Sequence, residues 1–182
     1  MGNSYTEEYK DLYHGTTDEY ATAIINANEF TPSKTGWCGY GVYFYDIKAK
    51  AWWSANRTCS INKQSNPAVI IADIQPLSRV QILDLRSING IKDFADFVND
   101  TLAELDFDID NCLDSFECTR LKRAILLDLY CEKNDIKIVV GYFQQDRISD
   151  CKNFADAWQL AIGIEAIYCV KDPTTICNIR RV

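Results

Sequence analysis

The sequence predicts a single α+β domain, and three observations support that class. Its 182 residues suffice for one compact domain with a sizeable core. Hydrophobic residues make up 47% of the chain, which is usual for a globular protein. Segments with strand and helix character are mixed without strict alternation, and no linker, internal repeat or low-complexity tract separates them. We therefore expect residues 1–182 to form one domain.

The first two elements are a strand and a helix. Residues 11–15 have the pattern of a short strand that ends at a glycine. Thr16 followed by Glu19 has the form of a capping box, which marks a helix start. Apolar residues then recur at helical spacing and predict an amphipathic helix over 17–28. The recurring residues are Tyr20, Ala23, Ile24 and Ala27.

A glycine-rich and aromatic stretch follows at residues 36–45, Gly-Trp-Cys-Gly-Tyr-Gly-Val-Tyr-Phe-Tyr. Glycine admits positive φ and lets another backbone or a ligand come close. Val-Tyr-Phe-Tyr has high strand propensity, so we expect a tight turn and then a strand over 42–45. Its aromatic rings are either core residues or the wall of a pocket that holds a flat ring. Helix formers predict a helix over 46–55, and residues 57–67 are expected to be polar loop.

The remaining chain alternates less regularly between apolar strands and helices. A continuous apolar run such as Ala-Val-Ile-Ile-Ala indicates a buried strand. Strands are expected at 68–74, 80–85, 136–143, 165–170 and 176–179, with helices near 91–105 and 116–131. Residues 144–153 are polar and lead into a weak helical pattern around Trp158.

The charge of the chain disfavours one class of partner. The formal net charge is −7 and the pI is about 4.7, so the surface as a whole does not attract phosphate backbones. The N-terminus has no apolar signal region, and no apolar run is long enough for a membrane. We therefore expect a cytoplasmic protein without membrane contact.

The cysteines and histidine argue against zinc. None of the eight cysteines forms a Cys-x-x-Cys pair, and His14 is the only histidine, so a Cys/His zinc site is not expected. In a reducing cytosol the thiols are expected to be free.

Three short motifs, in order, carry a resemblance to a known family. They are Leu-Tyr-His-Gly-Thr at 12–16, Gly-Tyr-Gly-Val-Tyr-Phe at 39–44, and Glu165 opening an apolar strand. Each of the first two precedes a predicted helix, and about thirty residues separate them. Together they resemble the ADP-ribosyltransferase fold, in the branch of poly-ADP-ribose polymerases and diphtheria toxin. The resemblance implies a split β-sheet core with flanking helices, NAD as substrate, and likeness to small bacterial or phage-related toxins and effectors.

The resemblance also implies roles for individual residues. His14 would bond the adenosine ribose of NAD, and Gly15 would hold the nicotinamide carboxamide through its backbone. Tyr43 would stack on the nicotinamide ring. Glu165 would bond the nicotinamide ribose and stabilise the oxocarbenium-like transition state. The NAD-binding residues implied are His14, Gly15, Thr16, Gly41, Tyr43, Lys50 and Trp53, and the catalytic residues are His14, Tyr43 and Glu165.

Two positions depart from the family pattern. The second stacking aromatic falls, by strict count from Tyr43, on Ser54, and Trp53 is preferred over Trp52 as its replacement. Arginine-modifying members have Glu or Gln two residues before the catalytic glutamate. Here that residue is Gly163, so arginine is disfavoured as the acceptor.

The expected activity is mono-ADP-ribosylation of a macromolecule, with protein favoured as acceptor and nucleic acid possible. A toxin of this kind would have a neutralising partner protein. One alternative is a non-catalytic domain of the same fold that binds NAD or ADP-ribose. Another is a calcium-responsive interaction protein, because residues 106–117 place acids at positions 1, 3, 5, 9 and 12 of an EF-hand loop. Since Asn111 replaces the glycine of that loop and no paired loop is visible, an acidic helix connection is favoured there.

Overall fold

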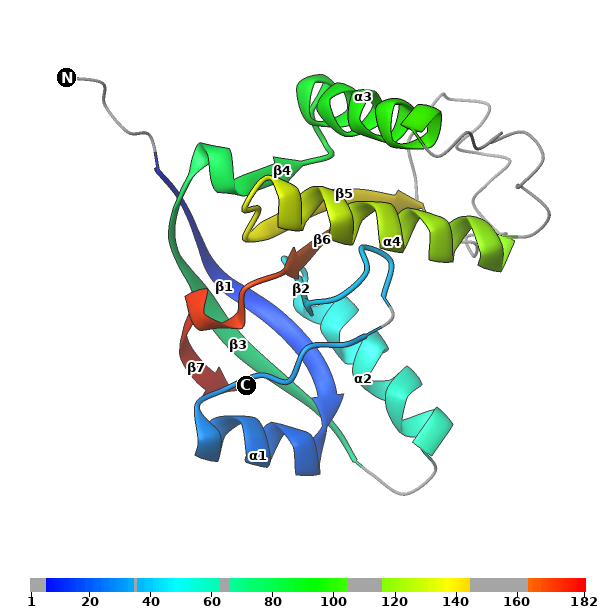
Figure 1. Ribbon diagram of the computed structural model, residues 1–182. Helices are drawn as coiled ribbons and strands as arrows, with labels where there is room; N and C mark the ends of the chain where they lie inside the picture. The colour runs from blue at the N-terminus through cyan, green and yellow to red at the C-terminus, as the bar shows by residue number, and fades with distance from the viewer. Residues whose placement is uncertain (1–5, 35, 63–65, 105–115, 145–163) are drawn as a thin grey trace, which may run out of the picture.

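A computed structural model describes residues 6–34, 36–62, 66–104, 116–144 and 164–182. In these ranges the protein is a seven-stranded mixed sheet with four α-helices, and the predicted α+β class is confirmed (Figure 1). None of these helices combines the length and apolar character needed to cross a membrane.

The sheet has the strand order β4-β5-β6-β2-β1-β3-β7. Its neighbouring strands are antiparallel, apart from the parallel pair β4 and β5. The strands are β1 (Thr6–Thr17), β2 (Val42–Tyr45), β3 (Pro67–Ser78), β4 (Ile82–Asp84), β5 (Ile138–Gln144), β6 (Ile164–Val170) and β7 (Ile176–Arg181). Short 3₁₀ turns at Arg79–Gln81 and Pro173–Thr175 precede β4 and β7.

The helices are α1 (Asp18–Ala27), α2 (Lys48–Asn62), α3 (Ile88–Glu104) and α4 (Phe116–Lys133). Neighbouring residues of a strand point to opposite faces of the sheet. On one face, Phe44 joins Phe30 and Ala21 of α1 in the larger core. On the other face, Tyr43 packs on a second core that includes Leu127 of α4.

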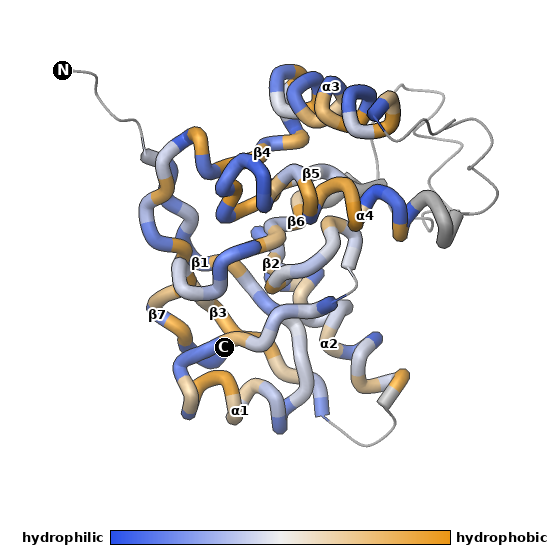
Figure 2. The backbone as a smooth tube through the Cα atoms, viewed as in Figure 1, coloured by the Kyte–Doolittle hydropathy of each residue, from blue (hydrophilic) through white to orange (hydrophobic). Residues whose placement is uncertain are grey.

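Helix α2 shares the face of Tyr43, because it lies directly over Gly15 of β1. Helix α3 packs outside α4, where Phe94 and Phe97 meet Tyr130 edge to face at 5.7 and 5.2 Å between ring centroids. Figure 2 shows hydrophobic positions on β3, α1 and α4, with hydrophilic positions interspersed along both helices.

Several predicted boundaries were wrong at the start of the chain. Strand β1 begins at Thr6, because its polar first half pairs with the end of β3 despite lacking an apolar pattern. The cap of α1 is Thr17, whose hydroxyl accepts a bond from the Tyr20 amide, since Thr16 still pairs with β3. Of the residues predicted for the apolar face, Ile24 packs on the core, whereas Tyr20 is 60% exposed and Ala23 and Ala27 are exposed too. Ala21, which was not predicted for this face, is buried in the core.

The predicted loop over residues 57–67 was also wrong, because α2 continues to Asn62. Polar side chains in its last turns bond to carbonyls one turn earlier: Asn56 donates to Trp52, Thr58 to Ser54 and Ser60 to Asn56. Such residues also favour turns, which is why their composition suggested a loop. The weak helix expected after residue 153 lies outside the described residues.

Candidate active site

The three predicted motifs lie on three neighbouring strands at the centre of the sheet. His14 and Gly15 are on β1, Tyr43 is on β2, and Glu165 is on β6. Tyr43 pairs with Cys169, and Glu165, opposite Phe143 of β5, lies two residues beyond the last β2–β6 pair, Tyr45 and Ile167. Four residues of strand, about 13 Å, therefore separate the Tyr43 register from that of Glu165.

The registered pairing between β1 and β2 consists of Tyr13 and Tyr45. Next to this pair, Nδ1 of His14 lies 2.8 Å from the carbonyl oxygen of Tyr43. The ring also packs on Phe30 and Phe44, at 5.2 and 5.6 Å between centroids. The histidine is thus anchored by one nitrogen, and its ring lies on the Phe44 face of the sheet, while the ring of Tyr43 lies on the other face.

The contact with Tyr43 fixes the tautomer of His14. A carbonyl oxygen only accepts, so Nδ1 carries the proton and Nε2 of the neutral ring is an acceptor. Burial lowers the pKa of His14, and the bond to the Tyr43 carbonyl offsets this only in part. The neutral ring can therefore accept a hydrogen bond from a hydroxyl at Nε2, which is the chemistry needed to hold a ribose.

The lowered pKa of His14 predicts a pH dependence of stability. Below the ordinary histidine pKa of about 6.5 the unfolded chain binds a proton that the folded protein resists. The free energy of unfolding should therefore be fully present above that pH and fall as pH drops towards the folded pKa. Urea unfolding of wild type and His14→Gln between pH 5 and 8 measures this. His14→Gln should lose the part of the slope that lies below about pH 6.5, and an unchanged slope would contradict the assignment.

The side chain of Tyr43 is held by the glycine turn that precedes it. Its hydroxyl donates to the carbonyl of Gly39 at 2.5 Å and accepts from the amide of Cys38 at 3.0 Å. A Cβ on Gly36 would lie 2.0 Å from that hydroxyl, so this glycine permits the close approach. Burial raises the pKa of Tyr43, so the phenol stays protonated. The ring is partly buried, with its position set by the turn rather than by α2.

Two glycines of the motifs, Gly15 and Gly41, have packing reasons of their own. A Cβ on Gly15 would lie 1.9 Å from the carbonyl oxygen of Ala51, so α2 rests on this residue. A Cβ on Gly41, at φ +153°, would lie 2.5 Å from the sulfur of Cys169. Thr16 is buried in β1 opposite Ala68. The two glycines therefore have a packing role, whether or not they contact NAD.

The predicted α2 residues contact one another. The Lys50 ammonium lies 4.0 Å from the ring centroid of Trp53, and the Arg57 guanidinium lies 5.5 Å from it. Lys50 is buried while Trp53 is 47% exposed. In the described part of the chain, the ring contacts of Trp53 are these two cations, and the structure does not bring it against Tyr43. Its stacking role stays a prediction.

Sequence reasoning missed a buried thiol cluster beneath Tyr43. Cys38, Cys131 and Cys169 are all buried in the core under α4. Burial tends to raise the pKa of Cys169, but a hydrogen bond from Cys38 and the charge of Lys171 outweigh it and lower the pKa. The cysteines lie far apart in the sequence, and only the register of β2 on β6 could have revealed the cluster.

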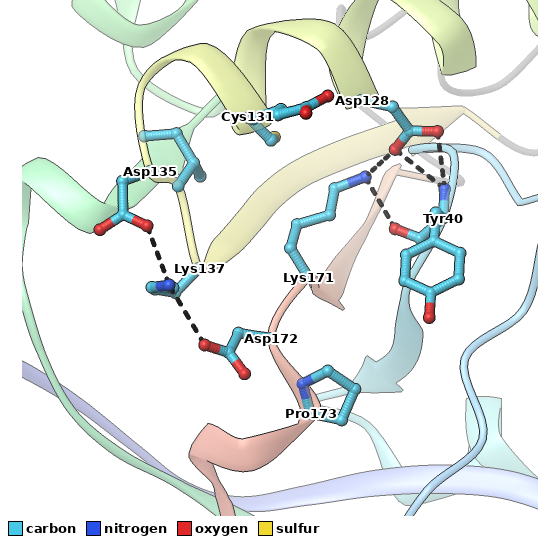
Figure 3. Close-up of a pocket in the computed structure, with 10 residues that line it drawn as sticks. Tyr40, Asp128, Cys131, Asp135, Lys137, Lys171, Asp172 and Pro173 are labelled. Atoms are coloured by element: carbon cyan, nitrogen blue, oxygen red, sulfur yellow. Dashed lines mark hydrogen bonds and ion pairs between the residues drawn. The ribbon is translucent and has the colours of Figure 1, made fainter.

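A cavity of about 550 Å³ lies at the opposite end of β2 and β6 from Glu165 (Figure 3). Six of its ten lining residues are charged, including Asp128 of α4 and Lys171 after β6. None of the predicted NAD-binding residues lines this cavity. It adjoins the glycine turn through Tyr40, Asp128 and Lys171.

Within the described ranges, no group of three or more His, Cys, Asp and Glu side chains could hold a metal ion. Most of the acidic stretch 106–117 lies outside those ranges, so the calcium alternative stays a prediction. Comparison of the chain with models of known protein families, with curated proteins and with solved structures found no match.

Proposed function

We propose that this protein is an NAD-dependent mono-ADP-ribosyltransferase. One observation carries the proposal: residues 14, 43 and 165, which are distant in sequence, lie on the adjacent strands β1, β2 and β6. The histidine adds support, because its Nδ1 bonds the Tyr43 carbonyl and its Nε2 has no hydrogen bond to the described part of the chain. These are the residue types that the resemblance assigns to NAD.

The proposed reaction breaks the bond between the anomeric carbon of the nicotinamide ribose and the nicotinamide nitrogen. The bonding electrons leave with the nitrogen, which is cationic in NAD and becomes neutral. Positive charge develops on the ribose, and the carboxylate of Glu165 stabilises it. The acceptor nucleophile then bonds to the anomeric carbon and loses its proton to solvent. Nicotinamide therefore needs no general acid in order to leave.

Three residues bind and orient the substrate in this proposal. Nε2 of His14 accepts a hydrogen bond from a hydroxyl of the adenosine ribose. Gly15 holds the carboxamide through its backbone, and the ring of Tyr43 stacks on nicotinamide. Trp53, with Lys50 beside it, is the proposed second aromatic of the site, and it would have to leave the two cations that now contact it.

We propose a protein as the acceptor, because the net charge of −7 disfavours a nucleic acid. Gly163, two residues before Glu165, disfavours arginine as the modified side chain. A toxin or effector role would add a neutralising protein as partner.

The test uses wild-type protein and two labelled forms of NAD. Label in the nicotinamide measures release, and label in the adenylate measures transfer to macromolecules of a cell lysate. Equilibrium dialysis without lysate measures NAD binding. We expect binding, release and a labelled band that resists denaturation, and protease or nuclease treatment identifies the class of acceptor.

The other outcomes are distinct. Release without transfer indicates a glycohydrolase. Binding without release identifies the non-catalytic NAD-binding domain. Absence of binding overturns the assignment of His14, Tyr43 and Glu165 to one pocket.

A further inference from the structure

The turn that holds Tyr43 is itself held by one lysine. The ammonium of Lys171, just after β6, donates to the carbonyl oxygens of Cys38 and Tyr40, the latter at 2.8 Å. Its third bond goes to Oδ1 of Asp128 at 2.7 Å. An ammonium has three donors, so each is used. The Lys171 side chain is only 8% exposed, so these bonds are not those of a solvent-exposed surface lysine.

Asp128 of α4 also holds the turn. We call Lys171 and Asp128 together the clamp. Both of its carboxylate oxygens lie 3.0 Å from the backbone nitrogen of Tyr40, which donates to them. Gly39 has φ +82°, and a Cβ there would lie 2.4 Å from the carboxylate. The carboxylate therefore lies against Gly39, and both the positive φ and the missing side chain of this glycine make room for it (Figure 3).

Two residues of the turn, Cys38 and Gly39, contact both the Lys171–Asp128 pair and the Tyr43 hydroxyl. Lys171 donates to the Cys38 carbonyl, and the amide of Cys38 donates to the Tyr43 hydroxyl. Asp128 lies against Gly39, whose carbonyl accepts from that hydroxyl at 2.5 Å. A displacement of the turn thus moves the hydroxyl and, with it, the ring.

We propose that Lys171 and Asp128 are positioning residues that fix the glycine turn 36–41 and thereby hold the Tyr43 ring for nicotinamide. The proposal rests on the proposed function for its kinetic consequence, but the clamp itself does not require NAD. It assigns a role to a charged pair outside the three motifs. The pair acts on substrate only through Tyr43.

Neutralising Lys171 should leave the fold intact. Asp128 is 38% exposed and remains solvated by the 550 Å³ cavity, so Lys171→Met strands no buried carboxylate. Lys137 provides a matched control, because it lines the same cavity and bonds Asp135 at 2.9 Å and Asp172 at 3.2 Å. Figure 3 shows Lys137 on the opposite side of the cavity from the turn.

The first measurement is hydrogen exchange of peptides spanning residues 36–43. In Lys171→Met the amides of this segment should exchange about tenfold faster than in wild type, while Lys137→Met leaves them unchanged. Because this measurement needs no NAD, it stands even if the wild type proves inactive. Unchanged exchange in Lys171→Met would overturn the clamp, whatever the activity of the wild type.

The second measurement is a double-mutant cycle in nicotinamide release. Lys171→Met and Tyr43→Phe should each lower kcat/KM about tenfold, since small misplacement of substrate costs rate steeply. The double variant should lose no more than the larger single loss, because both changes release the same ring. Losses that multiply would show that Lys171 acts by another route and would refute the positioning role.

Asp128→Asn serves if Lys171→Met does not fold. It removes the charge but keeps an oxygen that can accept from the Tyr40 amide, so a smaller loosening of residues 36–43 is expected. Exchange as slow as in wild type would count against the proposal. A wild type that neither binds NAD nor releases nicotinamide, with the turn still loosened in the variant, would sink the proposed function and leave the clamp standing.

Discussion

Glu165→Gln is expected to lower nicotinamide release about a hundred- to a thousandfold, the usual cost of removing a group that stabilises developing charge. Glutamine keeps the shape of glutamate but carries no negative charge to offset the positive charge on the ribose. NAD affinity should change by less than about threefold, because that charge develops only in the transition state. Release is measured under single-turnover conditions, and affinity by equilibrium dialysis.

Glu104→Gln, at the exposed end of α3, is the matched control and should leave both quantities unchanged. The melting temperature of Glu165→Gln should stay close to that of wild type, since β6 pairs through its backbone at this residue. Release at the wild-type rate in Glu165→Gln would show that another residue carries the chemistry. A loss of NAD binding that matches the loss of rate would assign Glu165 to ground-state binding instead.

The sequence was most informative where local chemistry determines local structure. Val-Tyr-Phe-Tyr at 42–45 became β2 with the predicted bounds, and the apolar runs became β3, β5 and β6 within a few residues. Strand propensity and apolar runs are properties of neighbouring residues, so a single sequence reveals them. The resemblance assigned His14, Tyr43 and Glu165 to one site, and the structure has these residues on the adjacent strands β1, β2 and β6, while their common role stays a prediction.

Long-range contacts were beyond the reach of that reasoning. Nothing near Lys171 or Asp128 in sequence indicates that they meet the turn at 38–40, more than eighty residues earlier along the chain. The first half of β1 pairs with β3, but it has no apolar face in the sequence from which a strand could have been predicted. Likewise, α2 runs to Asn62 because its polar side chains bond to their own helix.

Gly15→Ala is expected to lower the free energy of unfolding by about 2–3 kcal/mol, within the range seen when an extra methyl is forced into a packed interior. The new Cβ would lie 1.9 Å from the carbonyl oxygen of Ala51 and 2.8 Å from the backbone nitrogen of Ala55. Both atoms belong to the backbone of α2, so relief requires the helix to move away from β1. Urea unfolding of wild type and variant measures the loss.

A second variant tests that physical cause. Because the close atoms are backbone, Gly15→Ala combined with Ala51→Gly should recover no stability, and glycine within α2 should cost about 1 kcal/mol more. Recovery in the double variant would place the clash at the Ala51 side chain.

The same geometry affects how activity data are interpreted. Loss of nicotinamide release in Gly15→Ala does not by itself demonstrate a carboxamide contact, because α2 carries Lys50 and Trp53 and would move to relieve the clash. Only a variant whose stability equals that of wild type separates the binding role of β1 from its packing role.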